Sequence, residues 1–240
     1  MSLTARLQEL REFDTALLAN TIGFIDPTPV EETYMGGSIR SMTPELGPTV
    51  GVAVTCEIDA STPGGVHDMG PFWSQVERIA AMDEPVFWVA KRVGSRPDHE
   101  CVFGDGMAKN LGAAGCVGMI TDGGVRDLAG CRTADFAVYA AQTTIHHGAY
   151  RVRSVDQPIE VGGITVSPGD VLHANEEGVI RIPKTCLDEL PAAATRMLAC
   201  EHEMHYALRR TDLTVAEKLQ NSKDVFEAYG FAFPKPEEQE

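Results

Sequence analysis

The fold of this chain is decided by the stretch Gly104–Asp127, which reads GDGMAKNLGAAGCVGMITDGGVRD. Residues from about Gly106 to Ala114 have helical spacing, and the apolar run Cys116–Thr121 is typical of a buried strand. Two glycines then predict a turn that leads into the pair Arg126-Asp127. The stretch therefore predicts a helix followed by a strand, which is the repeating unit of an α/β protein.

Three side chains in this stretch point to chemistry. Asp105 opens the expected helix, and after twenty intervening residues Arg126 and Asp127 follow the expected strand. Two carboxylates and one guanidinium can therefore meet at one edge of a sheet. Such a set is what metal-assisted chemistry on a small anionic substrate requires.

Upstream of this stretch, helix and strand patterns alternate. Leucines and Phe13 recur every three or four residues and predict one amphipathic helix over about residues 3–22. The run Thr49–Cys56 predicts a strand, the apolar spacing of 72–80 a helix, and Val86–Ala90 a buried strand. Together with a further strand at Phe136–Tyr139, this order predicts an α/β fold in which parallel strand pairs dominate.

Downstream, short strands with turn signals between them predict a β-rich meander over residues 161–183. Alanine-rich helical patterns follow over about residues 184–229, and 234–240 is a polar, acidic tail. No internal repeat or linker divides the chain, so we expect a single domain over residues 1–240.

The composition narrows the classes of function. The chain has 240 residues, is 43% hydrophobic and carries a formal net charge of −15. These values favour a globular enzyme over a nucleic-acid-binding protein, which needs clustered Lys and Arg. No apolar run has the length of a membrane span, and no signal sequence precedes the first helix, so we expect a cytoplasmic protein without membrane contacts.

The cysteines do not form a recognisable metal or redox motif. No CxxC pair occurs, and we therefore expect reduced and mostly buried thiols, with Cys116 in a strand core. The six positions are Cys56, Cys101, Cys116, Cys131, Cys186 and Cys200.

A family resemblance rests on two sequence blocks. The first is Gly104–Asp127, and the second is 161–183, which reads VGGITVSPGDVLHANEEGVIRIP. With Asp105-x20-Arg126-Asp127 they resemble the RraA-like family, most clearly over about residues 101–183. That family contains divalent-metal aldolases that act on 4-hydroxy-4-methyl-2-oxoglutarate and related acids, and also non-catalytic regulators of ribonuclease E. The resemblance implies a swivelling-type α/β/β/α sandwich with flanking terminal helices, assembled as a homotrimer or hexamer with sites at subunit interfaces.

The resemblance also implies roles for individual residues. Asp127 would bind Mg²⁺ or Mn²⁺ directly, Asp105 would hold or act through metal-bound water, and Arg126 would contact the keto oxygen of a 2-oxo acid. The substrate carboxylate would rest on the backbone N–H groups of Gly106 and Met107, since the start of a helix attracts anions. A carboxylate-poor shell of this kind suits a hard cation that keeps several waters.

The expected reaction is retro-aldol cleavage, which leaves an enolate on the pyruvate half of the substrate. Loss of CO₂ from oxaloacetate gives the same enolate, so a decarboxylase activity is expected beside the aldolase activity. Arg126 would stabilise the enolate oxygen, and Asp105 or a water it positions would transfer a proton.

Other interpretations of these residues stay open. Asp105 could instead be a helix cap and Arg126-Asp127 a turn ion pair. Lys109 could form a Schiff base, although a solvated helix lysine is the commoner case. Because neighbours on a strand face opposite ways, we expect His146 and His147 to have surface or core roles. His173 alternates with apolar residues and predicts a core or interface histidine.

The last open points concern departures from the family and the function itself. Asn175 replaces an acid common in the family, and the segments 59–69 and 94–100 are unfamiliar and could reshape the substrate pocket. Glu201 or Glu203 could reach the site of a neighbouring subunit. The alternatives to the lyase are a trimeric regulator that binds a ribonuclease or other protein, and an enzyme for an unrelated oxo acid; the complete Asp105, Arg126 and Asp127 set favours catalysis.

Overall fold

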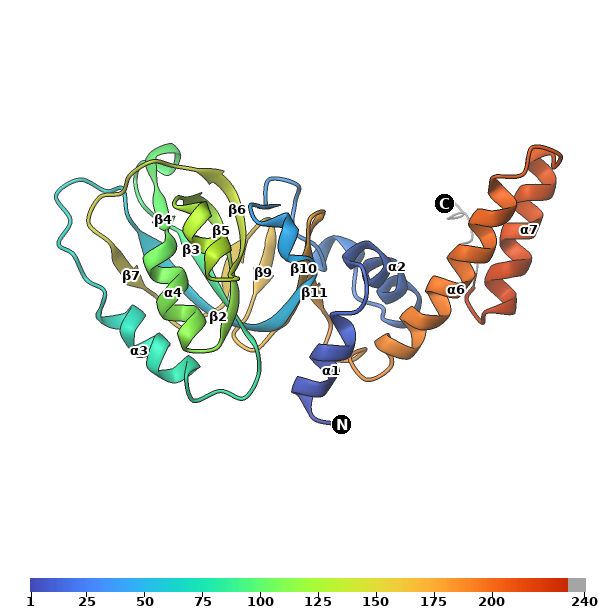
Figure 1. Ribbon diagram of the computed structural model, residues 1–240, viewed down its shortest axis with the longest axis horizontal. Helices are drawn as coiled ribbons and strands as arrows, with labels where there is room; N and C mark the ends of the chain where they lie inside the picture. Colours follow the sequence, from blue (N-terminus) through green and yellow to red (C-terminus); the bar gives the residue numbers. More distant parts are fainter. Residues whose placement is uncertain (233–240) are drawn as a thin grey trace, which may run out of the picture.

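A computed structural model of the chain describes residues 1–232 and has a curved mixed sheet with helices packed around it (Figure 1). The strands are β1 (Arg40–Ser41), β2 (Thr49–Asp59), β3 (Val86–Arg92), β4 (Cys101–Phe103), β5 (Cys116–Val125), β6 (Ala137–Thr143), β7 (Arg151–Arg153), β8 (Ile159–Val161), β9 (Ile164–Val166), β10 (Val171–Asn175) and β11 (Gly178–Ile182). The helices are α1 (Leu3–Leu10), α2 (Thr15–Ile25), α3 (Gly70–Ile79), α4 (Asp105–Ala113), α5 (Leu128–Thr133), α6 (Leu190–Leu208) and α7 (Val215–Ala228), with short 3₁₀ turns η1 (Val30–Glu32), η2 (Pro44–Leu46) and η3 (Pro97–His99).

The centre of the sheet is parallel, as the alternating pattern predicted. Within the described residues the main path runs β1-β6-β5-β3-β2-β10-β11, and β2, β3, β5 and β6 pair in parallel. The strand β4 pairs with the end of β5, and β7 pairs with the end of β2. The expected α/β class is confirmed, and the parallel strands bring several carboxyl ends to one edge of the sheet.

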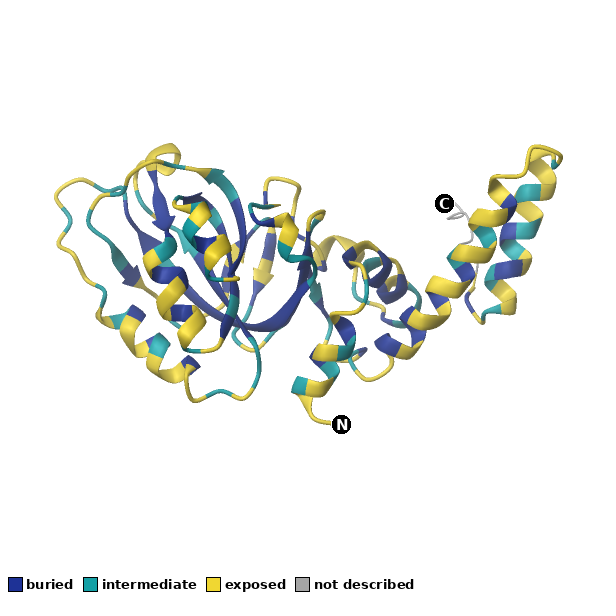
Figure 2. Ribbon diagram, in the orientation of Figure 1, coloured by how far each residue is buried: buried dark blue, intermediate teal, exposed yellow. Residues whose placement is uncertain are grey.

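Both faces of the sheet are buried, which explains why the central strands are almost wholly apolar (Figure 2). On one face, α3 and α4 cover a core that contains Phe72, Trp88 and Phe103. On the other face, the β8–β9 hairpin packs over Phe87 and Tyr139. The sheet is therefore a middle layer, and its edges carry the exposed loops.

Two elements differ from the sequence prediction. The expected helix over 3–22 is two helices, because the Asp14 side chain accepts a hydrogen bond from the Ala16 N–H and begins α2 anew. The expected meander is divided: β8 and β9 form a separate hairpin, whereas β10 and β11 join the main sheet beside β2.

The glycines before Arg126 lie in a strand rather than in a turn. β5 continues to Val125, with an irregular register between Thr121 and Gly124. A Cβ atom at Gly124 would lie 2.7 Å from the Glu100 carbonyl oxygen and 2.0 Å from Thr144 Oγ1, so only glycine permits this approach. This close packing fixes the last residues of β5, and Arg126 follows directly after them.

Asn175 has a clear local role where the family commonly has an acid. Its amide donates to Asp14 Oδ2 at 2.8 Å, and its Oδ1 accepts the Glu177 N–H at 2.9 Å. The amide thereby connects the β10–β11 turn to the start of α2, which a second carboxylate facing Asp14 would not do.

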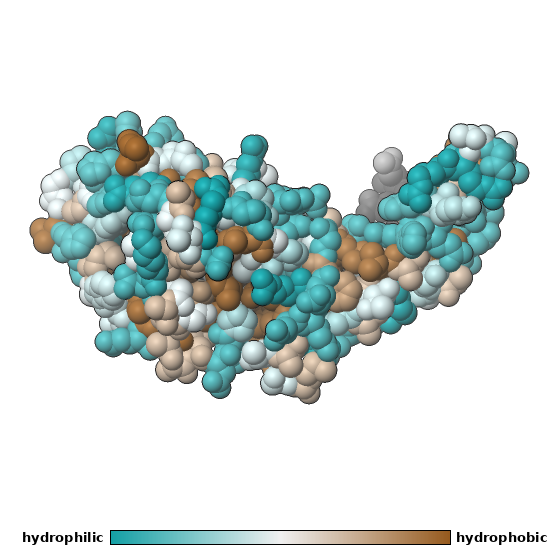
Figure 3. All heavy atoms as spheres, viewed as in Figure 1, coloured by the Kyte–Doolittle hydropathy of each residue, from teal (hydrophilic) through white to brown (hydrophobic). Residues whose placement is uncertain are grey.

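The C-terminal helices α6 and α7 form an arm that projects from the body (Figure 1). The first part of α6 packs on α1 and α2, while its distal half packs on α7 around a small core that includes Met197 and Val225. Figure 3 shows hydrophilic side chains over most of the end of the arm on the face in view. The expected tail at 234–240 lies outside the described residues, and among residues 1–232 no helix is long and apolar enough to cross a membrane.

Candidate active site at the edge of the sheet

Asp105 is the first residue of α4, directly after strand β4. Gly104 provides the N-cap without a side-chain hydrogen bond, so the acid stands at the positive end of the helix. Its Oδ2 atom accepts a hydrogen bond from Lys109 Nζ at 2.5 Å. Lys109 is the main cause that lowers the pKa of Asp105, so the carboxylate stays ionised and is a weak base.

Arg126 and Asp127 follow β5 at the same edge. The Arg126 N–H donates to the Phe103 carbonyl at 3.0 Å, which holds the end of β5 beside the end of β4. Arg126 Nε lies 3.2 Å from Asp127 Oδ2. The two strand ends therefore place the guanidinium and both acids in one region.

Asp127 has an unusual backbone conformation for a residue with a side chain. Its φ and ψ angles are 56° and 36°, in the left-handed region, and it precedes α5 without any side-chain capping hydrogen bond. Backbone strain of this kind clusters at functional sites. The Asp127 carboxylate is half-exposed and pairs with Arg126 through Oδ2. The turn ion pair expected as the alternative role of Asp127 is present in its contact with Arg126, whereas Asp105 follows the N-cap Gly104 and does not itself cap α4.

Two glycines bring the carboxylates together. A Cβ atom at Gly104 would lie 3.1 Å from Asp127 Oδ2, and one at Gly130 would lie 2.5 Å from Asp105 Oδ2. Burial, followed by the charges of Asp105 and Asp127, raises the pKa of the Cys131 thiol to about 11. The acids thus lie on either side of the start of α5, and they share an electrostatic environment.

A loop after β6 forms the wall beside Arg126. His147 Nε2 lies 3.3 Å from Arg126 Nη2, and its Nδ1 lies 2.7 Å from the Gly148 carbonyl. A carbonyl only accepts, so Nδ1 carries the proton and Nε2 accepts from Arg126. The imidazole also stacks on Tyr150 with a centroid distance of 4.1 Å, and burial raises the pKa of that tyrosine.

The contact between His147 and Arg126 was missed in the sequence. His146 and His147 lie in a loop rather than on a strand, and neighbours in a loop need not face opposite ways. The signal that would have found His147 is topological, because β6 runs parallel to β5 and its loop must pass the end of β5.

The two backbone N–H groups expected to bind the substrate carboxylate, those of Gly106 and Met107, have different surroundings. Gly106 is exposed, and no atom lies within 4 Å of where its Cβ would be, so a ligand can approach closely. The Met107 N–H already donates to the Gly104 carbonyl at 3.1 Å, and its side chain is buried. Gly106 is the better placed of the two.

The other candidate residues, Lys109, His173 and the cysteines, are either buried or held in a protonation state that is unreactive. The Asp105 carboxylate raises the pKa of the exposed Lys109, which keeps the amine cationic and unsuited to Schiff-base formation. His173 is buried as expected between Thr15 Oγ1 (2.9 Å) and the Leu10 carbonyl (3.1 Å), and burial lowers its pKa to about 4. All six cysteines are free and buried, as predicted.

The two late glutamates belong to the arm. Glu201 accepts from Asn20 at 3.3 Å, and Glu203 accepts from the Tyr229 hydroxyl at 3.1 Å. Both contacts are made by α6, away from the sheet edge within this chain. Their suggested reach into a neighbouring subunit stays a prediction.

The donor set at the edge fits a hard divalent cation in part. Within residues 1–232 no three His, Cys, Asp or Glu side chains gather closely enough to form a protein cage for a metal. Mg²⁺ does not need one, because it is commonly held by one or two carboxylates, waters and substrate oxygens. Asp127 is the better direct ligand, since Lys109 already occupies Oδ2 of Asp105.

Comparison with known proteins identifies a family. The family model described as RraA-like, Aldolase/RraA, matches residues 26–181. A protein of Halalkalibacterium halodurans, named as a putative 4-hydroxy-4-methyl-2-oxoglutarate aldolase, is 35% identical over 80 residues, which cover 33% of this chain and 37% of that protein. The match therefore spans little more than a third of that relative.

Solved structures show the same fold at low identity. RraAS2 of Streptomyces coelicolor, described as an unusual member of the RNase ES inhibitor RraA family, superposes with a TM-score of 0.65 at 18% identity, over 86% of this chain and 96% of that one. A structure described as a novel cellulase from gut-associated microbes gives 0.69 at 20% identity, over 84% and 87% of the two chains. The family match and the shared fold together place this chain in the RraA-like family.

Proposed function

We propose that this protein is a divalent-metal-dependent lyase for small 2-oxo acids. Its reaction would be retro-aldol cleavage of 4-hydroxy-4-methyl-2-oxoglutarate-type substrates to pyruvate, with oxaloacetate decarboxylation through the same pyruvate enolate. The observation that carries the proposal is the meeting of Asp105, Arg126 and Asp127 at one edge of the sheet, where the backbone of Asp127 is left-handed and its side chain makes no capping hydrogen bond.

In the proposed reaction Arg126 binds and stabilises the developing charge. Its guanidinium would donate to the 2-oxo oxygen, which becomes the enolate oxygen when the carbon–carbon bond breaks. The contact with His147 and the ion pair with Asp127 fix the plane of the guanidinium before substrate arrives. Asp127 would bind Mg²⁺ or Mn²⁺ directly and Asp105 would hold a metal-bound water; the cation would supply a Lewis acid for the 2-oxo group.

The proton steps are assigned to water rather than to a carboxyl group. Lys109 lowers the pKa of Asp105, and such a carboxylate is a poor base but a good hydrogen-bond acceptor. Asp105 would therefore orient the water that moves the proton. The N–H of the exposed residue Gly106, which also interacts with the Asp105 carboxylate, would bind the substrate carboxylate at the positive end of α4.

The assembly and the compartment belong to the same proposal. The family resemblance favours a homotrimer or hexamer in the cytoplasm, with small 2-oxo acids as the partners of the site. The competing function, a regulator that binds a ribonuclease, does not require two acids beside an arginine, one of them with a left-handed backbone. The regulator would release no pyruvate from either 2-oxo acid.

The experiment is a measurement of pyruvate release from oxaloacetate and from 4-hydroxy-4-methyl-2-oxoglutarate. Each assay uses the full chain with Mg²⁺, with Mn²⁺ and with excess EDTA, corrected for metal alone. We expect turnover that EDTA abolishes, and the ratio of the two rates ranks aldolase against decarboxylase. Turnover unchanged by EDTA would remove the metal from the proposal, and no turnover on either acid would favour the regulator.

A further inference from the structure

A second feature lies beside His147, the residue that contacts Arg126. It is a pocket of about 400 Å³, a volume in the range of small-molecule sites. Three segments line it: residues 60–65, Arg96 with His99, and 144–149. Because His147 contributes to the lining and also contacts Arg126, the pocket adjoins the proposed pyruvate site.

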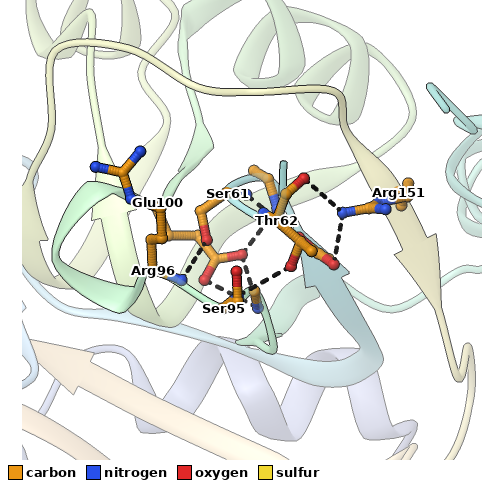
Figure 4. A network of polar contacts seen from close by, with 9 residues as sticks. Ser61, Thr62, Ser95, Arg96, Glu100 and Arg151 are labelled. Carbon is orange, nitrogen blue, oxygen red and sulfur yellow. Dashed lines mark hydrogen bonds and ion pairs between the residues drawn. The ribbon is translucent and has the colours of Figure 1, made fainter. Parts of the chain in front are cut away.

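Buried carboxylates hold the pocket in shape (Figure 4). Glu100 has no exposed surface and accepts the N–H groups of Ala60 at 2.8 Å and Gly94 at 3.0 Å, which ties together the loops that looked unfamiliar in the sequence. Asp59 pairs with Arg151 at 2.8 Å under the same loop. These bonds make the pocket a built feature of the chain.

The loop that carries His147 is fastened to the same framework. The Gly148 N–H donates to the Ala60 carbonyl at 2.6 Å, and the Thr144 N–H donates to the Val125 carbonyl at 3.0 Å. The first bond joins the loop to the pocket floor, and the second joins it to the strand that ends at Arg126. The pocket and the proposed site are thus fixed relative to each other.

The charge of the lining is opposite to that of the protein. The chain has a net charge of −15, yet the lining contains the Arg96 side chain and no acid. The Arg96 backbone N–H is held by Ser61 Oγ at 3.0 Å, while its exposed guanidinium points away from the buried carboxylates (Figure 4). A pocket of this kind favours an anionic group.

We propose that this pocket binds a carboxylate on the part of the substrate beyond the 2-oxo acid unit, and that Arg96 determines this specificity. The inference rests on the proposed function, because it takes Arg126 as the position of the 2-oxo group. In a 2-oxoglutarate-type substrate this group is the carboxylate at the end of the carbon chain away from the 2-oxo group. A guanidinium at the pocket matches such a carboxylate in shape and charge.

The test is calorimetric titration of the full chain with Mg²⁺ and two ligands of equal length. 2-Oxoglutarate has a distal carboxylate and lacks the 4-hydroxyl that retro-aldol cleavage needs, while 2-oxopentanoate ends in a methyl group. We expect about tenfold tighter binding of 2-oxoglutarate, reduced to less than about threefold in Arg96→Gln. Binding of 2-oxopentanoate should not change, because the loop anchor is the Arg96 backbone.

The matched control is Arg209→Gln, the same change in charge at an exposed position at the end of α6. Equal binding of the two ligands by the wild type, or a preference that survives in Arg96→Gln, would overturn the inference. Oxaloacetate turnover in the same preparations separates the two proposals. Oxaloacetate turnover without an Arg96-dependent preference for 2-oxoglutarate would refute only the role of the pocket. The preference without oxaloacetate turnover would refute only the proposed lyase activity.

Discussion

The sheet edge that carries Asp105, Arg126 and Asp127 and the pocket beside it are built in different ways. The edge is held by strand ends and helix starts, with the Arg126 N–H bonded to the Phe103 carbonyl. The pocket is made of loops, which depend on the buried Glu100 side chain for their anchorage. This contrast suggests that the reaction is fixed by the fold, while the choice of substrate depends on residues that can vary without disturbing it.

The largest expected effect is at Asp127, the proposed direct ligand. Asp127→Asn keeps the size of the side chain and tolerates the left-handed backbone, so the protein should fold normally. We expect kcat/KM for pyruvate release to fall about 10³-fold, since an amide is a weak ligand for a hard cation. Asp135→Asn is the control, because Asp135 also has positive φ (49°); similar losses in both variants would point to the backbone instead of the metal.

Arg126→Lys should reduce kcat/KM about 10²-fold, because an ammonium group cannot donate from a planar fork to both His147 and a substrate oxygen. The steady-state assay with oxaloacetate measures this loss. Arg132→Lys makes the same change on α5, where the side chain pairs with the exposed Glu45, and should leave the rate nearly unchanged. Full activity of Arg126→Lys would mean that another group holds the keto oxygen.

Glu100→Ala tests the other side of the comparison. Burial is the main cause that raises the pKa of Glu100. Removing the Glu100 carboxylate leaves the Ala60 and Gly94 N–H groups without their acceptor. We expect the free energy of unfolding in urea to fall by about 2–4 kcal/mol. The preference for 2-oxoglutarate should weaken while oxaloacetate turnover persists.

The matched control for Glu100 is Glu77→Ala, an exposed acid on α3 that should not change the free energy of unfolding. Equal loss of oxaloacetate turnover and of the ligand preference in Glu100→Ala would contradict the separation of edge and pocket.

Lys109→Gln should have the smallest effect, with turnover within about threefold of the wild type, because Lys109 forms an exposed ion pair with Asp105. A Schiff-base mechanism predicts complete inactivation instead. Borohydride added to wild-type protein with pyruvate gives an independent reading by mass spectrometry. A reduced pyruvyl adduct on Lys109 would refute the metal-dependent proposal.

The sequence predicts the regular parts of the molecule well, because they depend on local pattern. The apolar runs at Thr49–Cys56 and Val86–Ala90 correspond to β2 and β3, and Asp105 begins its helix as expected. The break before α2 was missed because the leucine spacing continues across Asp14 while its capping bond interrupts the helix. Pattern alone does not reveal such a competition.

The contacts of the candidate site were less predictable. The sequence pattern predicted Asp105, Arg126 and Asp127 as site residues. It did not predict the left-handed backbone of Asp127 or the approach of His147, which depends on how β6 returns beside β5. The anchorage of two unfamiliar loops by Glu100 is likewise a long-range contact, forty residues from Ala60. Such contacts require the tertiary structure.

The most direct test of the central claim is Mn²⁺ binding followed by electron paramagnetic resonance, because free Mn²⁺ gives a strong signal that is lost on binding. Wild-type protein and Asp127→Asn are titrated side by side in the presence of pyruvate. We predict that the wild type removes the free Mn²⁺ signal and that Asp127→Asn does not at the same concentrations. Equal uptake by both proteins, or none by either, would contradict a metal site at Asp127.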